Sequence, residues 1–138
     1  MKYRSGYNLF VFLRHALSVP IIWSLIIPFL ILDLWLEIYH RTCFPLYRIP
    51  YVPRRKYIKI DRHKLQYLSW LEKTFCMYCG YVNEVIHYVT EVAARTEEYW
   101  CGVMHKKDDQ FIPPPHHLEK GFVDYGEEKA LLERFKRK

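Results

Sequence analysis

A long apolar segment near the N-terminus is the strongest pattern in the chain. Residues 16–36 read ALSVPIIWSLIIPFLILDLWL, and Asp33 is the one charged side chain among them. A helix rises about 1.5 Å per residue, so a segment of this length covers roughly the 30 Å hydrocarbon layer of a bilayer. The pattern predicts a membrane helix, and we assign residues 1–40 to a membrane anchor.

Three alternatives to a simple membrane span arise from the same segment. A secretory signal peptide fits poorly, because the apolar run is too long and no small-residue cleavage site follows it. A buried core helix would need more protein around it than the remaining chain provides. Pro20 and Pro28 each remove a helical hydrogen bond and favour a kink. A re-entrant hairpin or an interfacial helix therefore stays open beside a full span.

The next segment, residues 41–60, reads RTCFPLYRIPYVPRRKYIKI and is interrupted by prolines. Pro45, Pro50 and Pro53 exclude a long helix, so the pattern predicts an extended basic strap along the membrane surface. Residues 40–64 carry eight lysine and arginine side chains against one acid, Asp61. Anionic lipid headgroups attract such a segment.

The same basic residues predict the location of the chain. Lysine and arginine near the ends of a membrane segment face the cytoplasm. We therefore expect the cell (inner) membrane as the location, with the bulk of the chain cytoplasmic and a short N-terminus outside. Nucleic acid is not expected as a partner, because the charge directly follows an apolar segment and no groove-reading motif is present.

Helical periodicity returns after the strap. Asp61 is a plausible N-cap for a helix through Phe75, and a second helix is predicted over Tyr81–Trp100. Between them, Cys76–Gly80 is typical of a turn, so residues 61–105 are expected to form an antiparallel helical hairpin. The tail, residues 106–138, is expected to be flexible, with a short helix near Glu127–Arg137. The predicted class is mainly α.

The composition indicates that the part of the chain after the apolar segment needs an additional source of stability. Apolar residues make up 51% of the chain, but much of that content precedes Tyr39, so the remainder can bury only a small core. Small cores are commonly completed by a metal, a disulfide or a partner. Aromatic residues reach 17%, with twelve tyrosines and four tryptophans, which favours membrane interfaces and protein contacts. We expect other membrane subunits or a second copy of the chain as partners.

The cysteines are the first candidates for chemistry. Cys76-x-x-Cys79-Gly80 is typical of half a metal knuckle, and Cys101 with His105 could supply the other half of a site for zinc, or less favourably iron. A straight helix over residues 81–100 would separate the halves by about 30 Å. The helix must then break, two chains must pair head to tail, or two separate clusters must form.

Other interpretations of these cysteines remain open. Cys43 could join either cluster, and His63, perhaps with Asp61, could approach Cys101 in the arrangement with two clusters. The cysteines could also be buried thiols that behave as small apolar side chains, or Cys76 and Cys79 could form a redox dithiol. Structural disulfides are not expected in a cytoplasmic domain.

A second candidate site lies on the polar side of the predicted second helix. Glu84-x-x-His87 has the spacing used in di-iron carboxylate bundles, where Glu72 and Glu91 could add carboxylates. The chain has one such motif, so a homodimer would be needed to complete it. The alternative is a solvated face on which Glu91 and Arg95 form an ordinary ion pair. His116 and His117, after three prolines, are either solvated side chains or metal ligands.

The segment from the IDRHKL motif through Cys76 and Cys79, followed by Tyr99-Trp100-Cys101 and His105, resembles a family of small uncharacterised bacterial membrane proteins. The resemblance covers roughly residues 30–125 and implies no known activity. That family is expected to have Asn-Gly where this chain has Asn83-Glu84, which would start the second helix later.

Two functions are compatible with the sequence. The first is a non-enzymatic, metal-binding accessory or scaffold subunit of a larger membrane assembly. The second is a membrane-bound oxidoreductase or metalloenzyme that uses the Cys76/Cys79 dithiol or a carboxylate–histidine site. Neither function assigns a catalytic role to an individual residue at this point.

Overall fold

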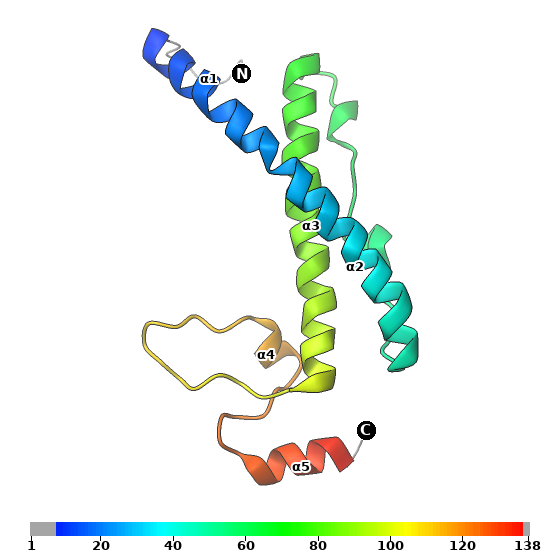
Figure 1. The fold of residues 1–138 in the computed structure, drawn as a ribbon. Helices are drawn as coiled ribbons and strands as arrows, with labels where there is room; N and C mark the ends of the chain where they lie inside the picture. Colours follow the sequence, from blue (N-terminus) through cyan, green and yellow to red (C-terminus); the bar gives the residue numbers. More distant parts are fainter. Residues whose placement is uncertain (1–7, 137–138) are drawn as a thin grey trace.

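The computed structural model describes residues 8–136, and helices dominate it (Figure 1). The described residues contain no β-strand, although Val103 and Val123 form an isolated parallel bridge. The predicted mainly α class is therefore confirmed. The elements are α1 (Leu9–Ser24), α2 (Ile26–Leu46), the short 3-10 helices η1 (Arg54–Lys56) and η2 (Arg62–Lys64), α3 (Trp70–Trp100), α4 (His116–Glu119) and α5 (Glu128–Lys136).

The apolar helix is longer than predicted. α1 and α2 together form a rod over Leu9–Leu46, which is long and apolar enough to cross a membrane. Asn8 caps its start, because its side chain accepts a hydrogen bond from the Val11 amide. The predicted N-terminal segment before Asn8 lies outside the described residues.

The rod is interrupted at Leu25, between α1 and α2. Pro28 has no amide hydrogen, so the carbonyl of Ser24 cannot form its normal helical bond. The helix is thus interrupted about one turn before Pro28, one of the two prolines at which a kink was predicted, whereas Pro20 lies inside α1. The Tyr78 hydroxyl of α3 donates a hydrogen bond of 2.5 Å to the carbonyl of Ile22 beside this break.

The predicted turn at Cys76–Gly80 is wrong, because α3 continues without interruption from Trp70 to Trp100. The buried positions Tyr78, Val85, Tyr88 and Val92 keep one helical register across Gly80. The N-cap is Ser69 rather than Asp61. Ser69 and Glu72 form a reciprocal capping box, which fixes the start of the helix eight residues later than predicted.

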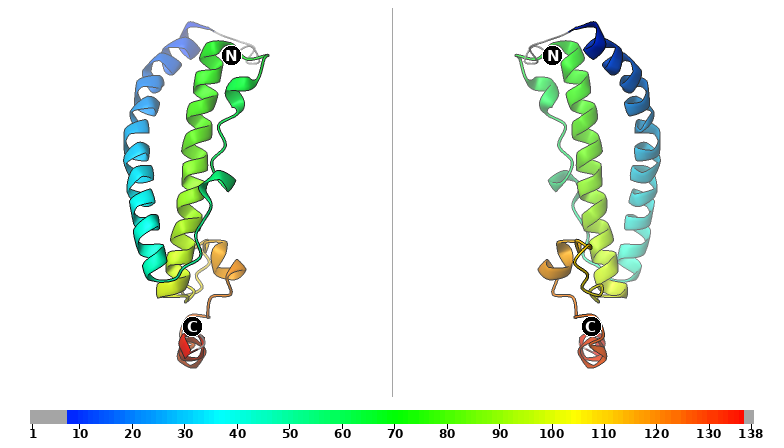
Figure 2. Two further views of the ribbon diagram at one scale, coloured as in Figure 1. Left: turned by 90° about the vertical axis from the view of Figure 1, so that its right-hand side faces the viewer. Right: turned by 90° about the vertical axis from the view of Figure 1, so that its left-hand side faces the viewer.

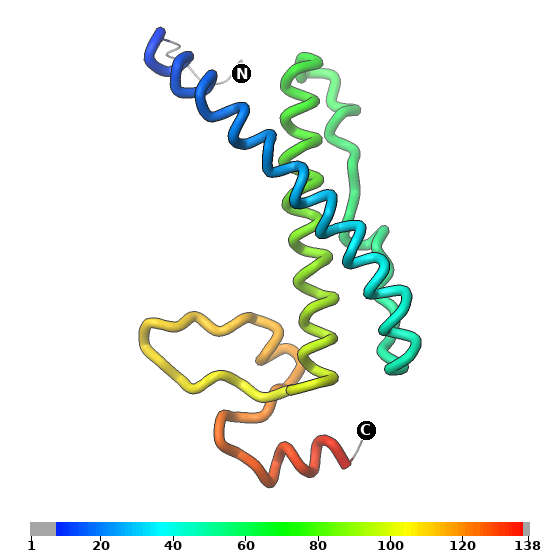
Figure 3. Tube along the Cα trace, in the orientation of Figure 1, coloured from blue at the N-terminus to red at the C-terminus, as the bar shows by residue number. Residues whose placement is uncertain are grey.

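The predicted antiparallel hairpin is replaced by two parallel helices. Contacts advance along both helices in the same direction: Trp23 meets Tyr78, Tyr39 hydrogen-bonds Thr96 over 2.8 Å, and Tyr47 packs on Tyr99. The connection, residues 47–69, must therefore return along the whole pair, as the tube in Figure 3 traces. Near the start of α3, the connection and α1 lie on opposite sides of α3. The apolar rod, α3 and the connection therefore form three layers (Figure 2).

A small core lies where the end of α2, the connection and α3 meet. Its buried side chains are Phe44, Ile49, Val52, Tyr88 and Val92. Arg48 adopts a left-handed conformation with φ of 55°, and this turns the chain out of α2 so that Ile49 and Val52 reach the core. Such a core is small for a chain of this size, as the composition predicted.

The C-terminal arm, residues 101–136, leaves the end of α3 as a wide loop, returns through α4 and ends in α5 (Figure 1). Phe122 is buried and stacks on His117 at 4.7 Å between ring centroids. The predicted short C-terminal helix is confirmed as α5; Arg137 lies outside the described residues.

Candidate functional site

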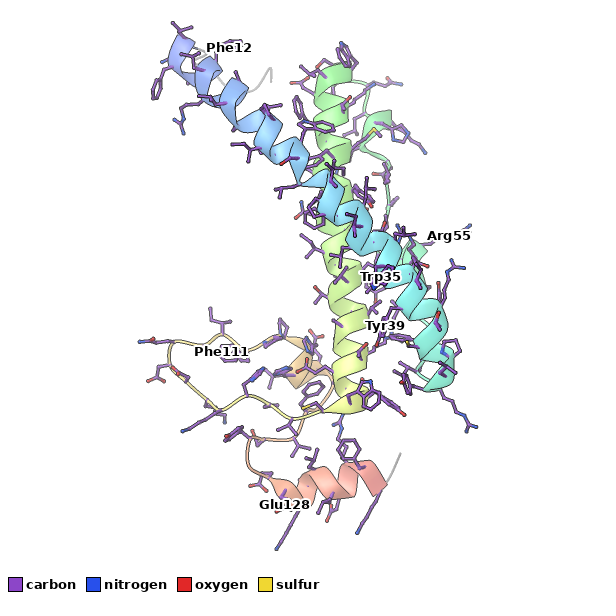
Figure 4. The ribbon with its side chains drawn as sticks, viewed as in Figure 1. Phe12, Trp35, Tyr39, Arg55, Phe111 and Glu128 are labelled. Carbon is purple, nitrogen blue, oxygen red and sulfur yellow. The ribbon has the colours of Figure 1, made fainter. Side chains whose placement is uncertain are left out.

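The first functional feature is the sidedness of the apolar rod. Most of its exposed side chains are large and hydrophobic, and Phe12 and Trp35 show this on α1 and α2 in Figure 4. Its buried positions on α2 are Asp33, His40 and Phe44. The exposed set is Leu9, Phe10, Phe12, Leu13, Leu17, Ile21, Ile22, Leu25, Ile27, Leu30, Ile31, Leu32, Leu34, Trp35, Ile38 and Leu46.

This distribution is the reverse of that in a water-soluble helix, which buries its apolar stripe and exposes its polar one. Here Asp33, Glu37 and His40 of α2 face the protein, Arg41 near the end of the helix is exposed, and most apolar side chains face outward. Ionisable groups inside membrane segments follow the same rule, because they face protein and pair with one another.

Asp33 is the centre of the buried polar contacts. Arg54 donates one hydrogen bond from each terminal guanidinium nitrogen to the Asp33 carboxylate, the second over 2.6 Å. The Tyr81 hydroxyl donates a further bond of 2.8 Å to the same carboxylate. Burial and the Asp33 carboxylate together raise the pKa of Tyr81 to about 12. The pair of Asp33 and Arg54 therefore fastens the connection to α2.

One turn further along α2, Glu37 and His40 meet the Tyr88 hydroxyl. Tyr88 lies 2.9 Å from Glu37 Oε1 and 2.8 Å from His40 Nδ1. His40 Nε2 accepts the amide hydrogen of Val52 over 3.1 Å, which fixes the tautomer: Nδ1 carries the proton and donates to the Tyr88 oxygen, while the Tyr88 hydroxyl donates to Glu37. Burial and the bond to Glu37 raise the pKa of Tyr88. The polar groups are thus mutually satisfied.

The connection carries the exposed basic charge. Arg62 packs its side chain against Gly80 on α3, at 3.9 Å from the position that a Cβ there would take. Gly80 is two residues from Tyr78, which contacts Ile22 in the rod. The connection at η2 therefore lies about level with Ile22, and Figure 2 shows the connection on the opposite side of α3 from the rod. The exposed basic side chains of the connection are Arg55, Lys56, Lys59, Arg62, His63 and Lys64.

The second functional feature is a His–Glu cluster, formed by Glu97, His116 and His117, at the end of α3. Glu97 lies in the last turn of α3, and the two histidines begin α4. One ligand atom from each residue lies within 4.8 Å of the others. His116 Nε2 is 2.7 Å from Glu97 Oε2, and His117 Nε2 is 3.2 Å from Glu97 Oε1.

Burial and charge favour this cluster as a ligand site. His117 is buried with 1% of its side chain exposed, whereas a third of the Glu97 side chain remains accessible. Burial would raise the pKa of the Glu97 carboxyl, but its hydrogen bonds with His116 and His117 outweigh burial and lower that pKa. The carboxylate is therefore ionised at neutral pH and available to a cation. Of the described residues, these three alone meet the geometric requirement for a metal site.

The cysteine set predicted from the sequence is not brought together in one chain. Cys76 and Cys79 lie one turn apart on α3, and Cys101 follows its last residue. With no break in α3, about 33 Å separates Cys79 from Cys101. A shared site for Cys76, Cys79, Cys101 and His105 would require two chains, and it stays a prediction. Cys43 lies on α2 and is a free thiol.

The weaker candidates have structural contacts instead. Glu72 caps α3, and Glu84 accepts the backbone amide of Lys59. His87 packs edge-on against Tyr57. Glu91 pairs with Arg95 at 2.7 Å, as the i,i+4 alternative predicted, and the side chain of Lys120 also approaches it.

Two further predicted residues lie in different places. His63 is exposed on η2. His105 lies beside the His–Glu cluster, with its ring centroid 5.4 Å from that of His117.

Glu97 is the functional residue that sequence reasoning missed. His116 and His117 follow a run of prolines, and no spacing rule connects them to a carboxylate about twenty residues earlier. The only feature of the sequence that pointed to this site was the pair of adjacent histidines, which lies in a segment with few apolar residues. The neighbouring carboxylate, Glu98, pairs with Arg134 at 3.5 Å and is not part of the cluster.

Comparison of the chain with protein-family models, with curated proteins and with solved structures found no match. The resemblance to small bacterial membrane proteins therefore stays a prediction, and function is argued from the molecule itself.

Proposed function

We propose that this chain is a membrane-bound accessory or scaffold protein, held on the bilayer by α1–α2, that presents α3 and the connection to partner subunits. The sidedness of the rod carries the proposal. Its outer surface is apolar over residues 16–36 apart from Ser24, while Asp33 and His40 are buried against protein. Exposing so many large apolar side chains to water is unfavourable by roughly 25 cal/mol per Å² of apolar surface.

The rod lies in the plane of the membrane in this proposal, which is the interfacial alternative left open by the prolines. A spanning rod would carry the connection into the hydrocarbon, because Arg62 is level with Ile22. Each exposed basic side chain at that depth costs about 2.5–3.5 kcal/mol. The length of the rod also favours the interface: 38 residues extend about 57 Å, nearly twice the hydrocarbon thickness.

Placement in the plane also assigns roles to the other layers. With the outer face of α1–α2 in the acyl region, the connection faces the aqueous phase, which we infer is the cytoplasm. Trp70, Leu71 and Met77 on α3 are exposed and suit contact with other membrane subunits or a second copy of the chain. The alternative function, an oxidoreductase or metalloenzyme, gains no support from Glu84 or Glu91, because both make structural contacts.

Flotation with lipid vesicles tests membrane binding. The purified chain is expected to float with anionic vesicles, and Ile31→Lys on the outer face should reduce the bound fraction severalfold. Leu132→Lys on α5, at a similarly exposed apolar position, is the matched control and should bind as wild type does. Failure of the wild-type chain to float would overturn the proposal.

Labelling with a membrane-impermeant thiol reagent distinguishes the two orientations. Arg14→Cys and Arg41→Cys, at exposed charged positions toward the two ends of the rod, are each made in a background with the four native cysteines changed to serine. Each variant places one thiol outside the apolar surface near one end. In sealed vesicles, an in-plane rod exposes both thiols on the same side. Labelling of the two positions from opposite sides would establish a span and overturn the in-plane orientation.

A further inference from the structure

The His–Glu cluster offers the donor set of a metal centre. Two imidazoles and one carboxylate converge at the junction between α3 and α4, with ligand atoms within 4.8 Å of one another. Two histidines with one glutamate form a known protein ligand set for zinc, with the fourth position left to water or another ligand. We propose that Glu97, His116 and His117 bind a zinc ion that fastens the C-terminal arm to the end of α3.

The hydrogen-bond pattern of the histidines agrees with this assignment. Both Nε2 atoms face the Glu97 carboxylate. The other ring nitrogens, Nδ1 of His116 and of His117, are buried and have no hydrogen-bond partner among the described residues. Because the carboxylate can only accept, each Nε2 donates its N–H to Glu97. A zinc ion would displace these two protons and bind the same three ligand atoms.

The rings are held in place by packing. Phe122 stacks on His117, and the ring of His116 meets the edge of Phe122 at 5.7 Å. The amide of Phe122 also donates to the carbonyl of His117 over 2.9 Å. This packing restricts the side chains before any ion binds, which lowers the entropic cost of assembling the site.

The arm gives the ion a structural task. Residues 105–113 are exposed and make few contacts, so the loop from α3 to α4 is held mainly at its two ends. A metal that joins Glu97 to His116 and His117 closes this loop, and such closure stabilises the folded arm. His105, beside His117 on that loop, is the nearest candidate for the open fourth position.

Zinc titration of the full-length chain in detergent micelles, after chelator treatment, tests the site independently of membrane binding. We expect one zinc per chain, with affinity reduced about tenfold or more in Glu97→Gln and in His116→Ala. Glu98→Gln, which changes the neighbouring carboxylate, and the variant with all four cysteines changed to serine should bind as wild type does. Circular dichroism checks that each variant is folded.

The outcomes separate this site from the cysteine set. No zinc binding by wild type, or binding lost in the cysteine-free variant and retained in Glu97→Gln, would overturn the proposal. A second readout does not depend on any variant folding. Co²⁺ bound to wild type should lack the thiolate charge-transfer absorption that cysteine ligands produce, and its presence would overturn the assignment.

Discussion

Arg54 donates a hydrogen bond from each of its two terminal guanidinium nitrogens to the carboxylate of Asp33. This ion pair joins the connection to α2 at the point where the apolar rod meets the core. A side chain from the extended segment thereby neutralises the one acid of the predicted membrane segment. The pair also involves Glu37, whose Oε1 lies 3.5 Å from Arg54 Nη1. Arg54 thus compensates two acids of α2 at once, the buried Asp33 and the partly buried Glu37.

Removing the arginine should destabilise the fold. Arg54→Ala leaves the Asp33 carboxylate without its cation, and breaking a fully buried pair costs about 3–5 kcal/mol. About a third of the Arg54 side chain is exposed, so we expect about 2 kcal/mol. Urea unfolding in detergent micelles, followed by circular dichroism, measures this. Arg55→Ala on the exposed neighbour should change stability by less than about 0.5 kcal/mol, and an equal loss in both variants would contradict the role of the pair.

Tyr88 should contribute through its hydroxyl as well as its ring. Tyr88→Phe keeps the packing but removes the contacts with Glu37 and His40. Leaving buried polar partners unsatisfied costs about 1–3 kcal/mol. The same unfolding measurement should show this loss, while Tyr67→Phe, at an exposed position, should be neutral. A neutral Tyr88→Phe would mean that water replaces the hydroxyl.

The raised pKa of Tyr81 predicts a loss of stability in alkali. Burial, the hydrogen bond to Asp33 and the charge of that carboxylate favour the neutral phenol and raise its pKa from 10.0 to about 12. The contribution is therefore fully present below pH 10 and is lost as the pH rises from 10 to about 12. Stability measured across this range should fall less steeply in Tyr81→Phe than in wild type. Parallel curves for the two proteins would show that Tyr81 titrates normally.

The apolar rod could be predicted from the sequence because a long run of apolar residues is a local signal. The residues from Ala16 to Leu36 form part of it, and the break at Leu25 follows from Pro28. The helical class and α5 were likewise accessible from periodicity. The predicted turn at Cys76–Gly80 failed because a glycine is tolerated inside a helix when its neighbours keep one buried stripe. Here Tyr78 and Val85 continue that stripe on either side of Gly80.

The functional contacts were harder to predict, because they join residues far apart in the chain. Asp33 pairs with Arg54 and Tyr81, and Glu97 with His116 and His117. Each of these contacts depends on the parallel arrangement of α2 and α3 or on the return of the arm. The cysteines attracted attention through their local spacing, yet a continuous α3 separates Cys79 from Cys101. Local spacing is informative only when the intervening element brings its ends together.

Gly102 determines where the C-terminal arm leaves α3. Its φ of 66° lies in the left-handed region, and its amide donates to the carbonyl of Glu97 over 3.0 Å, as in many glycine-terminated helices. The Gly102 carbonyl in turn accepts the amide of Val123 over 2.9 Å. A Cβ at this position would lie 2.9 Å from Nε of Arg134, the α5 residue that donates to the Gly121 carbonyl.

Gly102→Ala should therefore destabilise the C-terminal arm by more than the energetic cost of placing alanine in the left-handed conformation. The left-handed conformation costs a non-glycine residue about 1–2 kcal/mol, and the new methyl group must also displace Arg134 from its contacts. Gly126→Ala is the matched control, because Gly126 has φ of 88° with no atom within 4 Å of an added Cβ. Amide hydrogen exchange over residues 121–136 should accelerate in both variants, and further in Gly102→Ala. Equal acceleration would show that the contact with Arg134 does not hold α5 in place.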